Sequence, residues 1–267
     1  MALTLEQLRD AAPAIFTEQP AATVSKKYFP VSTLQIVETL SQDGWVPVSA
    51  EQRHSRLLKH RPYAKHLLRF QHTAAHGVFP GAATVPGQAY PELVVSNSHN
   101  GTSPYQLYAG FHVVACLNGL IVADDVIGSI KVPHLVAYQQ QLRIAAETIR
   151  SMLVLVTDQV LAMRARILTD REREQFAHAA LQSKFPANNA PFTVPQVLLP
   201  RRESDKSHDL WTVFNVIQEN LMAGGTSGTT QSGRRYTSRP VRDVNQILTR
   251  NQAFWSMAVG ILKGSHV

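Results

Sequence analysis

Residues 135–167, with the sequence LVAYQQQLRIAAETIRSMLVLVTDQVLAMRARI, decide the fold. The stretch contains neither glycine nor proline, and its apolar residues return at intervals of three, four or seven positions: Leu142, Ile149, Leu153, Val156, Val160 and Ile167. Such spacing places apolar side chains on one face of an α-helix. We therefore predict one long helix, or two helices with a bend, whose apolar face packs against the rest of the chain.

The residues before this helix change to a β pattern. Short runs rich in branched and aromatic residues predict strands, and Asn118-Gly119 is typical of a hairpin turn. The runs are Trp45–Val48 leading into Glu51–His54, Lys65–His72, Leu93–Val95, Tyr105–Cys116 and Ile127–Val132. Glycine and proline in His76–Pro91 predict a flexible loop. The predicted fold class is α+β, with an antiparallel sheet of about five strands at 45–132 packed by the helix at 135–167.

Further helices are predicted on both sides of this core. Capping boxes mark several starts, because Ser or Thr followed three residues later by Glu or Gln satisfies free amides of a first turn. The predicted helices are Leu5–Ala11, a stripe from Leu34 that ends at Asp43-Gly44, a helix capped by Thr169 that runs to Phe185, Asp209–Met222, and Val244–Leu262 with Trp255 inward. We divide the chain into an N-terminal helical segment (1–44), the sheet with its long helix (45–168) and a C-terminal helical region (169–267), and expect one integrated domain.

The composition excludes wholly disordered and membrane-spanning proteins. Hydrophobic residues make up 44% of the 267 residues, which suffices for a buried core. No apolar run approaches the ~20 residues that cross a bilayer, and the N-terminus has no export-signal pattern. The single cysteine, Cys116, cannot form an intramolecular disulfide or a cysteine-rich zinc site. We predict a cytoplasmic protein that does not enter a membrane.

The charge balance is basic. Lysine and arginine number 26 against 19 acidic residues, which gives a net charge of +7 and a sequence pI near 9.7. A positive long-range field favours polyanionic partners, although many basic enzymes never bind nucleic acid. The distribution of the charges must therefore decide between partners.

The most informative basic stretch is the Gly/Arg-rich loop 224–242. Four arginines follow its glycines with no acid before Asp243: Arg234, Arg235, Arg239 and Arg242. Guanidinium groups on a glycine-rich backbone suit the phosphate oxygens of a nucleic acid. The alternative is a solvated surface loop.

A second basic segment extends over residues 53–69. We predict that four of its side chains line a track for a nucleic-acid backbone: Arg53, Arg56, Lys65 and Arg69. Tyr63 and neighbouring histidines would be available to stack on bases. The alternative is a sheet edge that charge protects from aggregation.

A polar loop at the end of a predicted strand is a third candidate. It comprises Ser98, His99, Asn100, Thr102 and Ser103. Such a cluster is typical of a binding or catalytic loop, but Asn-Gly also simply forms turns. The structural explanation stays open beside the functional one.

We assign no catalytic residue, no metal ligand and no cofactor. The spacing of His66, His72 and His76 fits no known ligand motif, and no acidic cluster accompanies them. A turn explains Asp124-Asp125, and Cys116 lies in an apolar stretch typical of an inert buried thiol. A non-enzymatic role is therefore favoured.

The chain resembles the domain of unknown function 932 family, also called uncharacterised protein family 0380. The motifs that carry the resemblance cover most of the chain in the expected order: Ser98-His99-Asn100-Gly101-Thr102-Ser103, Tyr105-Gln106, Gly110-Phe111, Asn118-Gly119-Leu120, Pro200-Arg201-Arg202, Asp209-Leu210-Trp211, Gln218-Glu219-Asn220-Leu221, Gly224-Gly225 and Asn251-Gln252-Ala253-Phe254-Trp255. The resemblance implies an association with plasmids and prophages. It implies no particular activity.

This chain departs from the family pattern at three positions. The family usually has Asp where this chain has Asn100, Arg where it has His112, and Ser or Gln where it has Leu117. A catalytic carboxylate at position 100 would be absent here. The departures therefore weaken a hydrolase hypothesis.

Three functional hypotheses remain open. The first is a nucleic-acid-binding protein of mobile genetic elements that binds or anneals single-stranded DNA. The second is an interaction protein that inhibits a host defence or replication factor by binding an acidic partner. The third is a metal-dependent nuclease that uses His99 and Asp124. Self-association into a homo-oligomer is also left open.

Overall fold

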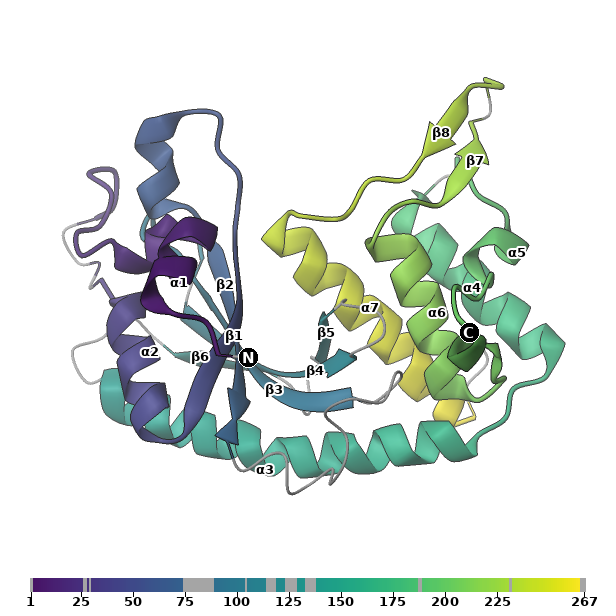
Figure 1. Cartoon of the computed structure of the whole chain (residues 1–267), viewed down its shortest axis with the longest axis horizontal. Coiled ribbons are helices and arrows are strands. Elements are labelled where there is room, and N and C mark those ends of the chain that lie inside the picture. Colours follow the sequence, from purple (N-terminus) through teal and green to yellow (C-terminus); the bar gives the residue numbers. More distant parts are fainter. Residues whose placement is uncertain are drawn as a thin grey trace.

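The computed structural model describes residues 2–25, 28, 30–73, 89–103, 105–113, 119–122, 129–132, 138–186, 189–230 and 232–264. Within these residues, a long helix, α3 (Tyr138–Ala165), lies under two halves of the molecule (Figure 1). One half contains the sheet and the N-terminal helices, and the other contains the C-terminal helices. Residues 138–165 thus form one helix rather than two.

The main sheet has six antiparallel strands. They are β1 (Trp45–Gln52), β2 (His66–His72), β3 (Ala89–Asn97), β4 (Tyr105–Val113), β5 (Gly119–Val122) and β6 (Ser129–Val132). The strands β1 to β4 are neighbours in chain order, and β5 and β6 both pair with β4. Because β5 pairs with Ala109–His112 and β6 with Tyr105–Tyr108, two short strands follow one another along one edge. The α+β class is confirmed.

The boundaries of the strands differ from the prediction in two places. The stretch from Gly119 forms a strand of its own, so the sheet gains a strand. β3 begins at Ala89, and Ala89–Pro91 therefore belong to the sheet although we predicted a loop to Pro91. The rest of that loop, from residue 76 to 88, lies outside the described residues, as do Cys116 and Asn118.

The N-terminal helices cover one face of the sheet. α1 (Leu5–Ala11) begins with the predicted capping box of Thr4 and Gln7, and a short helical turn, η1 (Pro13–Phe16), follows it. α2 (Thr33–Gln42) is capped by Ser32. Their apolar side chains form one cluster with the sheet and the first part of α3, which includes Leu8, Ile36, Leu40, Leu68, Phe70, Val95 and Leu142.

The C-terminal helices cover the opposite face. They are α4 (Asp170–Lys184), α5 (Val194–Val197), the short turn η5 (Glu203–Lys206), α6 (Leu210–Met222) and α7 (Val244–Leu262). Their apolar cluster includes Phe176, Trp211, Phe214 and Trp255 and reaches the sheet at Leu67, Val94 and Tyr108. Leu67 and Leu68 alternate between the two clusters, so both faces of β2 are buried. None of the described helices combines the length and apolar character needed to cross a bilayer.

Candidate functional site

The first basic segment leaves the sheet as the connector between β1 and β2. This connector, residues 53–65, contains the helical turn η2 (Leu58–Tyr63) and projects from the end of the sheet (Figure 1). Arg53 and Arg56 are exposed on it, together with Lys59 and Arg61. Arg53 Nε lies 3.5 Å from Asp243 Oδ2, and 57% of the Arg53 side chain remains exposed. The connector therefore carries its positive charge into solvent.

Lys65 and Arg69 do not lie on an exposed basic stripe, and that part of the prediction is wrong. Lys65 Nζ donates to Asn245 Oδ1 at 2.6 Å, and burial lowers the Lys65 pKa. Arg69 Nη1 lies 3.0 Å from the fully buried carboxylate of Glu92. Because protein covers both faces of β2, Arg69 on this strand is buried, and Lys65, just before the strand, is buried too. Neither residue can line a surface track.

The second basic stretch, 224–242, forms a β-hairpin rather than an irregular loop. Its strands β7 (Ser227–Thr229) and β8 (Arg235–Thr237) pair antiparallel with Gly228 opposite Tyr236. The Thr230 amide donates to the Arg234 carbonyl at 2.9 Å, and Gly233 has a φ of +77°, which favours glycine. All four predicted arginines are exposed, and none forms a salt bridge within the described part of the chain: Arg234, Arg235, Arg239 and Arg242.

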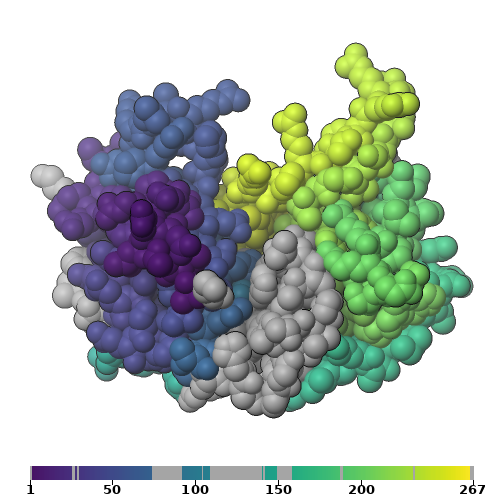
Figure 2. Space-filling model, in the orientation of Figure 1, coloured from purple at the N-terminus to yellow at the C-terminus, as the bar shows by residue number. Residues whose placement is uncertain are grey.

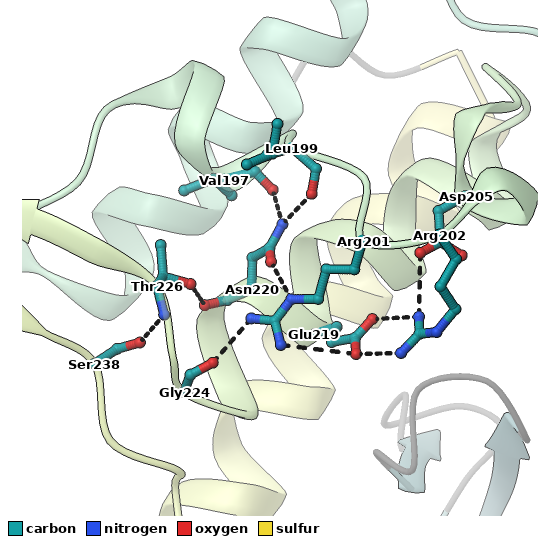
Figure 3. Close-up of polar contacts among 10 residues, drawn as sticks. All are labelled: Val197, Leu199, Arg201, Arg202, Asp205, Glu219, Asn220, Gly224, Thr226 and Ser238. Carbon is teal, nitrogen blue, oxygen red and sulfur yellow. Dashed lines mark hydrogen bonds and ion pairs between the residues drawn. The ribbon is translucent and has the colours of Figure 1, made fainter.

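A buried carboxylate on α6 anchors the segment that precedes this helix (Figure 3). Glu219, on α6, is only 5% exposed and accepts both terminal nitrogens of Arg202, at 2.6 and 2.8 Å. Arg202 also donates to Asp205, three residues ahead, so one guanidinium joins the turn η5 to α6. A two-pronged bond of this kind fixes the geometry of both partners.

The next residue, Asn220, extends this network to the base of the hairpin (Figure 3). Its amide donates to the carbonyls of Val197 and Leu199, at 2.9 Å each, and its side-chain oxygen accepts Arg201 Nε at 2.8 Å. Arg201 Nη2 donates to the Gly224 carbonyl at 2.9 Å. The Thr226 hydroxyl donates to the Asn220 backbone carbonyl at 2.9 Å. We call these contacts of Arg201, Arg202, Glu219 and Asn220 the α6 network; it holds the hairpin in a fixed position.

The first basic segment contacts the start of α7, which directly follows the second basic segment in the chain. Arg53 contacts Asp243, the residue that caps α7, and Lys65 contacts Asn245 in the first turn of that helix. Figure 2 shows a hollow at this end of the molecule, between the blue connector and the yellow-green hairpin, with yellow residues at its floor. We call this hollow the basic notch. Chain positions 180 residues apart are thus joined at one surface.

The polar loop after β3 is part of the fold rather than an open binding loop. Ser98, His99 and Ser103 are buried, and Ser98 Oγ donates to the Ser103 carbonyl at 3.2 Å. The Asn100 side-chain oxygen accepts the amide and the hydroxyl of Thr102, at 3.1 and 2.6 Å. This compact turn also accepts hydrogen bonds from the Ala21 amide and the Tyr28 hydroxyl, through the carbonyls of His99 and Ser98. The turn explanation therefore accounts for the cluster.

A buried histidine lies behind this turn. His66 Nδ1 lies 3.0 Å from the Ala64 carbonyl, and Nε2 lies 2.8 Å from the Thr33 hydroxyl. A carbonyl only accepts, so Nδ1 carries the proton and Nε2 accepts from Thr33. Burial, with the nearby ring of His99, lowers the His66 pKa to about 3. His66 is thus a neutral structural residue.

No group of three or more metal-ligating side chains occurs within the described residues. His72, another of the considered histidines, contacts the Asp43 carbonyl at 3.0 Å. His76 and Asp124 lie outside the described residues. The proposed pairing of His99 with Asp124 therefore stays a prediction.

Comparison with known proteins places the chain in a family. Residues 20–255 match the model described as Domain of unknown function (DUF932). The chain belongs to the DUF932 family. It is 33% identical over 260 residues to the UPF0380 proteins YfjQ and YafZ of Escherichia coli (strain K12), and each alignment covers 97% of this chain and 92% of the relative. No solved structure matches the chain.

The motifs that carried the DUF932 resemblance have clear structural roles here. Arg201 and Arg202 bind Glu219 and Asn220 in the α6 network, and Asp209 caps α6 by accepting the Thr212 amide at 2.9 Å. Gln218 Nε2 donates to Asn251 Oδ1 at 2.5 Å, which ties α6 to α7. These C-terminal motifs therefore hold α6, the segment before it and α7 together.

The departure at Asn100 also has a structural explanation. The side-chain oxygen of Asn100 accepts two hydrogen bonds from Thr102, and an aspartate oxygen would accept the same bonds. Both residue types therefore suit this turn. The His112 side chain and Leu117 lie outside what the structure describes.

Sequence reasoning missed Tyr236 and Glu219. Tyr236 lies in β8 between two polar residues, and the alternation of a strand after the turn at Gly233 is the pattern that could have found it. Glu219 is the one charged residue of α6, a helix with many apolar residues, and a charge at a buried position there indicates a buried partner. Which partner it has depends on distant folding, because Arg202 is 17 residues away.

Proposed function

We propose that this protein binds nucleic acid through the basic notch. The observation that carries the proposal is that the two basic segments come together at the start of α7: Arg53 and Lys65 of the first segment contact Asp243 and Asn245, which directly follow the second segment. Sequence patterns alone left these segments unconnected. Their meeting supports one continuous cationic surface rather than two scattered patches.

The charges of the notch are available for an anionic ligand. Asp243 is the acid that contacts Arg53, and its other oxygen accepts the Gln246 amide at 3.0 Å. The exposed arginines of the hairpin and of the segment after it have no salt bridge among the described residues. Guanidinium groups bind phosphate oxygens in pairs of parallel bonds. Repeated phosphates along a strand match this arrangement.

The experiment compares two double variants of equal charge. One is Arg239→Ala with Arg242→Ala, beside the notch, and the control is Arg171→Ala with Lys263→Ala, where both residues are exposed and Lys263 follows the far end of α7. Binding of a fluorescein-labelled 20-nucleotide DNA strand is followed by anisotropy at several salt concentrations. Each lost phosphate contact lowers the slope of log affinity against log salt by about 0.7 on single strands.

We expect the notch variant to reduce this slope by about 1.4, since it removes two contacts of about 0.7 each. The control should keep the wild-type slope. Equal losses in both variants would mean that net charge alone drives binding, and salt-insensitive binding by the wild type would end the proposal.

A protein partner is the second candidate function. Two leucines at the tip of the connector, Leu57 and Leu58, are 56% and 71% exposed beside the basic residues. Exposed apolar side chains rimmed by charge are typical of protein interfaces. A pull-down that recovers one stoichiometric acidic protein, and no nucleic acid after nuclease-free washing, would select this function. Retention of polymer with a raised 260/280 ratio would select the first.

A further inference from the structure

The ring of Tyr236 packs against other aromatic side chains of the protein. Its ring lies 5.5 Å from the ring of Phe192, which in turn meets Phe185 at 5.8 Å in an edge-to-face contact. Phe192 is buried, whereas Tyr236 is 37% exposed. The other large apolar side chains that are exposed within the described residues are aliphatic, so Tyr236 is the exposed aromatic ring there. It therefore presents part of a firmly held ring to solvent.

The strand opposite Tyr236, β7, has a glycine where it passes close to Pro191. The cross-strand partner of Tyr236 is Gly228, and a Cβ added there would lie 1.8 Å from the Pro191 carbonyl oxygen. The Thr229 amide also donates to that carbonyl, at 2.8 Å. The hairpin is thus pressed against residues 191–192, with no side chain from position 228 beside the Tyr236 ring.

A half-open pocket of about 490 Å³ lies beside this ring. Its lining is polar apart from the tyrosine and the glycine, and consists of Gln196, Ser227, Gly228, Thr229, Arg235, Tyr236 and Thr237. Gln196 Nε2 donates to the Ser227 carbonyl at 3.0 Å, which closes the pocket against α5. The pocket therefore combines a ring, several hydroxyl groups and one guanidinium.

We propose that the Tyr236 pocket takes one unpaired nucleotide of a single strand, with the base stacked on Tyr236 and a phosphate bound by Arg235. The inference rests on the proposed nucleic-acid function and adds a preference for single strands. In a duplex each base is already stacked between neighbours, so its faces cannot reach a side-chain ring. A single strand offers free base faces and the same phosphates.

The test uses a pair of variants that differ in the aromatic ring alone. Tyr236→Phe keeps the ring, and Tyr236→Leu keeps apolar contact with Phe192 but removes the ring. Their melting temperatures are compared with the wild type to show that both fold. Binding is measured by anisotropy with a 20-nucleotide DNA strand, the matching duplex and an RNA strand of the same sequence.

We expect Tyr236→Leu to weaken single-strand binding by about five- to a hundredfold, the range for loss of one stacked base. Duplex affinity and the salt slope should stay unchanged, because the ring releases no counterion. Tyr236→Phe should bind single strands like the wild type. A 2-aminopurine base in the strand should be quenched by the wild type and by Tyr236→Phe, but not by Tyr236→Leu. Ring-dependent binding of DNA, RNA or both supports the proposal.

Equal affinity of Tyr236→Leu and wild type for single strands would overturn this inference while leaving the notch proposal intact. Equal losses on single strand and duplex would overturn it as well, because the ring would then act through the shape of the hairpin. If the wild type binds no strand in a salt-dependent manner, both proposals fail together.

Discussion

Buried ionisable side chains carry the main energetic consequences at the level of single residues. His66 and the pair Arg69 and Glu92 lie inside the described fold, each with a specific partner. A buried charge without a partner costs several kcal/mol, which explains why Arg69 contacts a carboxylate. In the sequence, Arg69 is the last of several basic residues spread over positions 53–69. Its burial follows from coverage of both faces of the sheet, which no local pattern reveals.

Acid should destabilise the protein through His66. The folded-state pKa of about 3 lies below the usual 6.5, so the unfolded chain binds a proton that the folded chain excludes between these values. The resulting stability is present above pH 6.5 and is lost as pH falls toward 3. We expect a loss of about 1.4 kcal/mol at pH 5.5 relative to pH 7.5 from this residue, since one pKa unit corresponds to about 1.36 kcal/mol.

Urea unfolding of wild type and His66→Gln at both pH values measures this effect. The variant should be less stable at pH 7.5 because it disturbs the contact with Thr33, but its pH dependence should be smaller by about 1.4 kcal/mol. The same pH dependence in both proteins would show that His66 does not resist protonation.

Removal of one partner of the Arg69 and Glu92 pair should be costly. Glu92→Gln leaves a buried guanidinium without its counter-charge, and we expect a loss of about 3–5 kcal/mol in unfolding free energy. The double variant Arg69→Met with Glu92→Leu removes both charges and should be closer to wild type. A single variant more stable than the double one would argue against a true buried ion pair.

At the level of elements, local chemistry predicted most helices and missed the hairpin. The side chains of Thr4, Thr169 and Asp209 accept hydrogen bonds from amides three residues ahead. The starts of these helices can therefore be predicted from neighbouring residues alone. Strand β7 has only three residues and lies between glycines, and its stability comes from contacts with Pro191 and from the α6 network. Such support arises from distant parts of the chain and is therefore hidden from local patterns.

Loosening the α6 network should free the hairpin. Asn220→Ala removes the amide bonds to Val197 and Leu199 and the acceptor for Arg201, at an expected cost of about 1–3 kcal/mol. Trypsin should then cut after Arg234, Arg235 and Arg242 faster than in wild type, because a mobile segment enters the protease more readily. Ser204→Ala, on the exposed turn before α6, is the control and should be cut at the wild-type rate. Unchanged cleavage in Asn220→Ala would mean that the network does not hold the hairpin.

On the scale of the whole molecule, α3 and the two covered faces of the sheet bring the connector and the hairpin to one end (Figure 1). Of the eight side chains predicted to contact nucleic acid, Lys65 and Arg69 are buried, and six are exposed: Arg53, Arg56, Arg234, Arg235, Arg239 and Arg242. In the polar turn at 98–103, Ser98, His99 and Ser103 are buried, whereas Gly101 and Thr102 are exposed. Composition thus indicated the sign of the charge, while tertiary packing decided which residues present it.

The most direct measurement is a map of crosslinks between the protein and a photoreactive strand. A DNA strand with 4-thiothymidine at several positions is irradiated in complex with the wild type, and crosslinked peptides are identified by mass spectrometry. We predict crosslinks in residues 53–61 and 234–242, on both sides of the basic notch, and their loss at high salt. Crosslinks confined to α4 or to the outer surface of α3, with none in these two segments, would contradict the account.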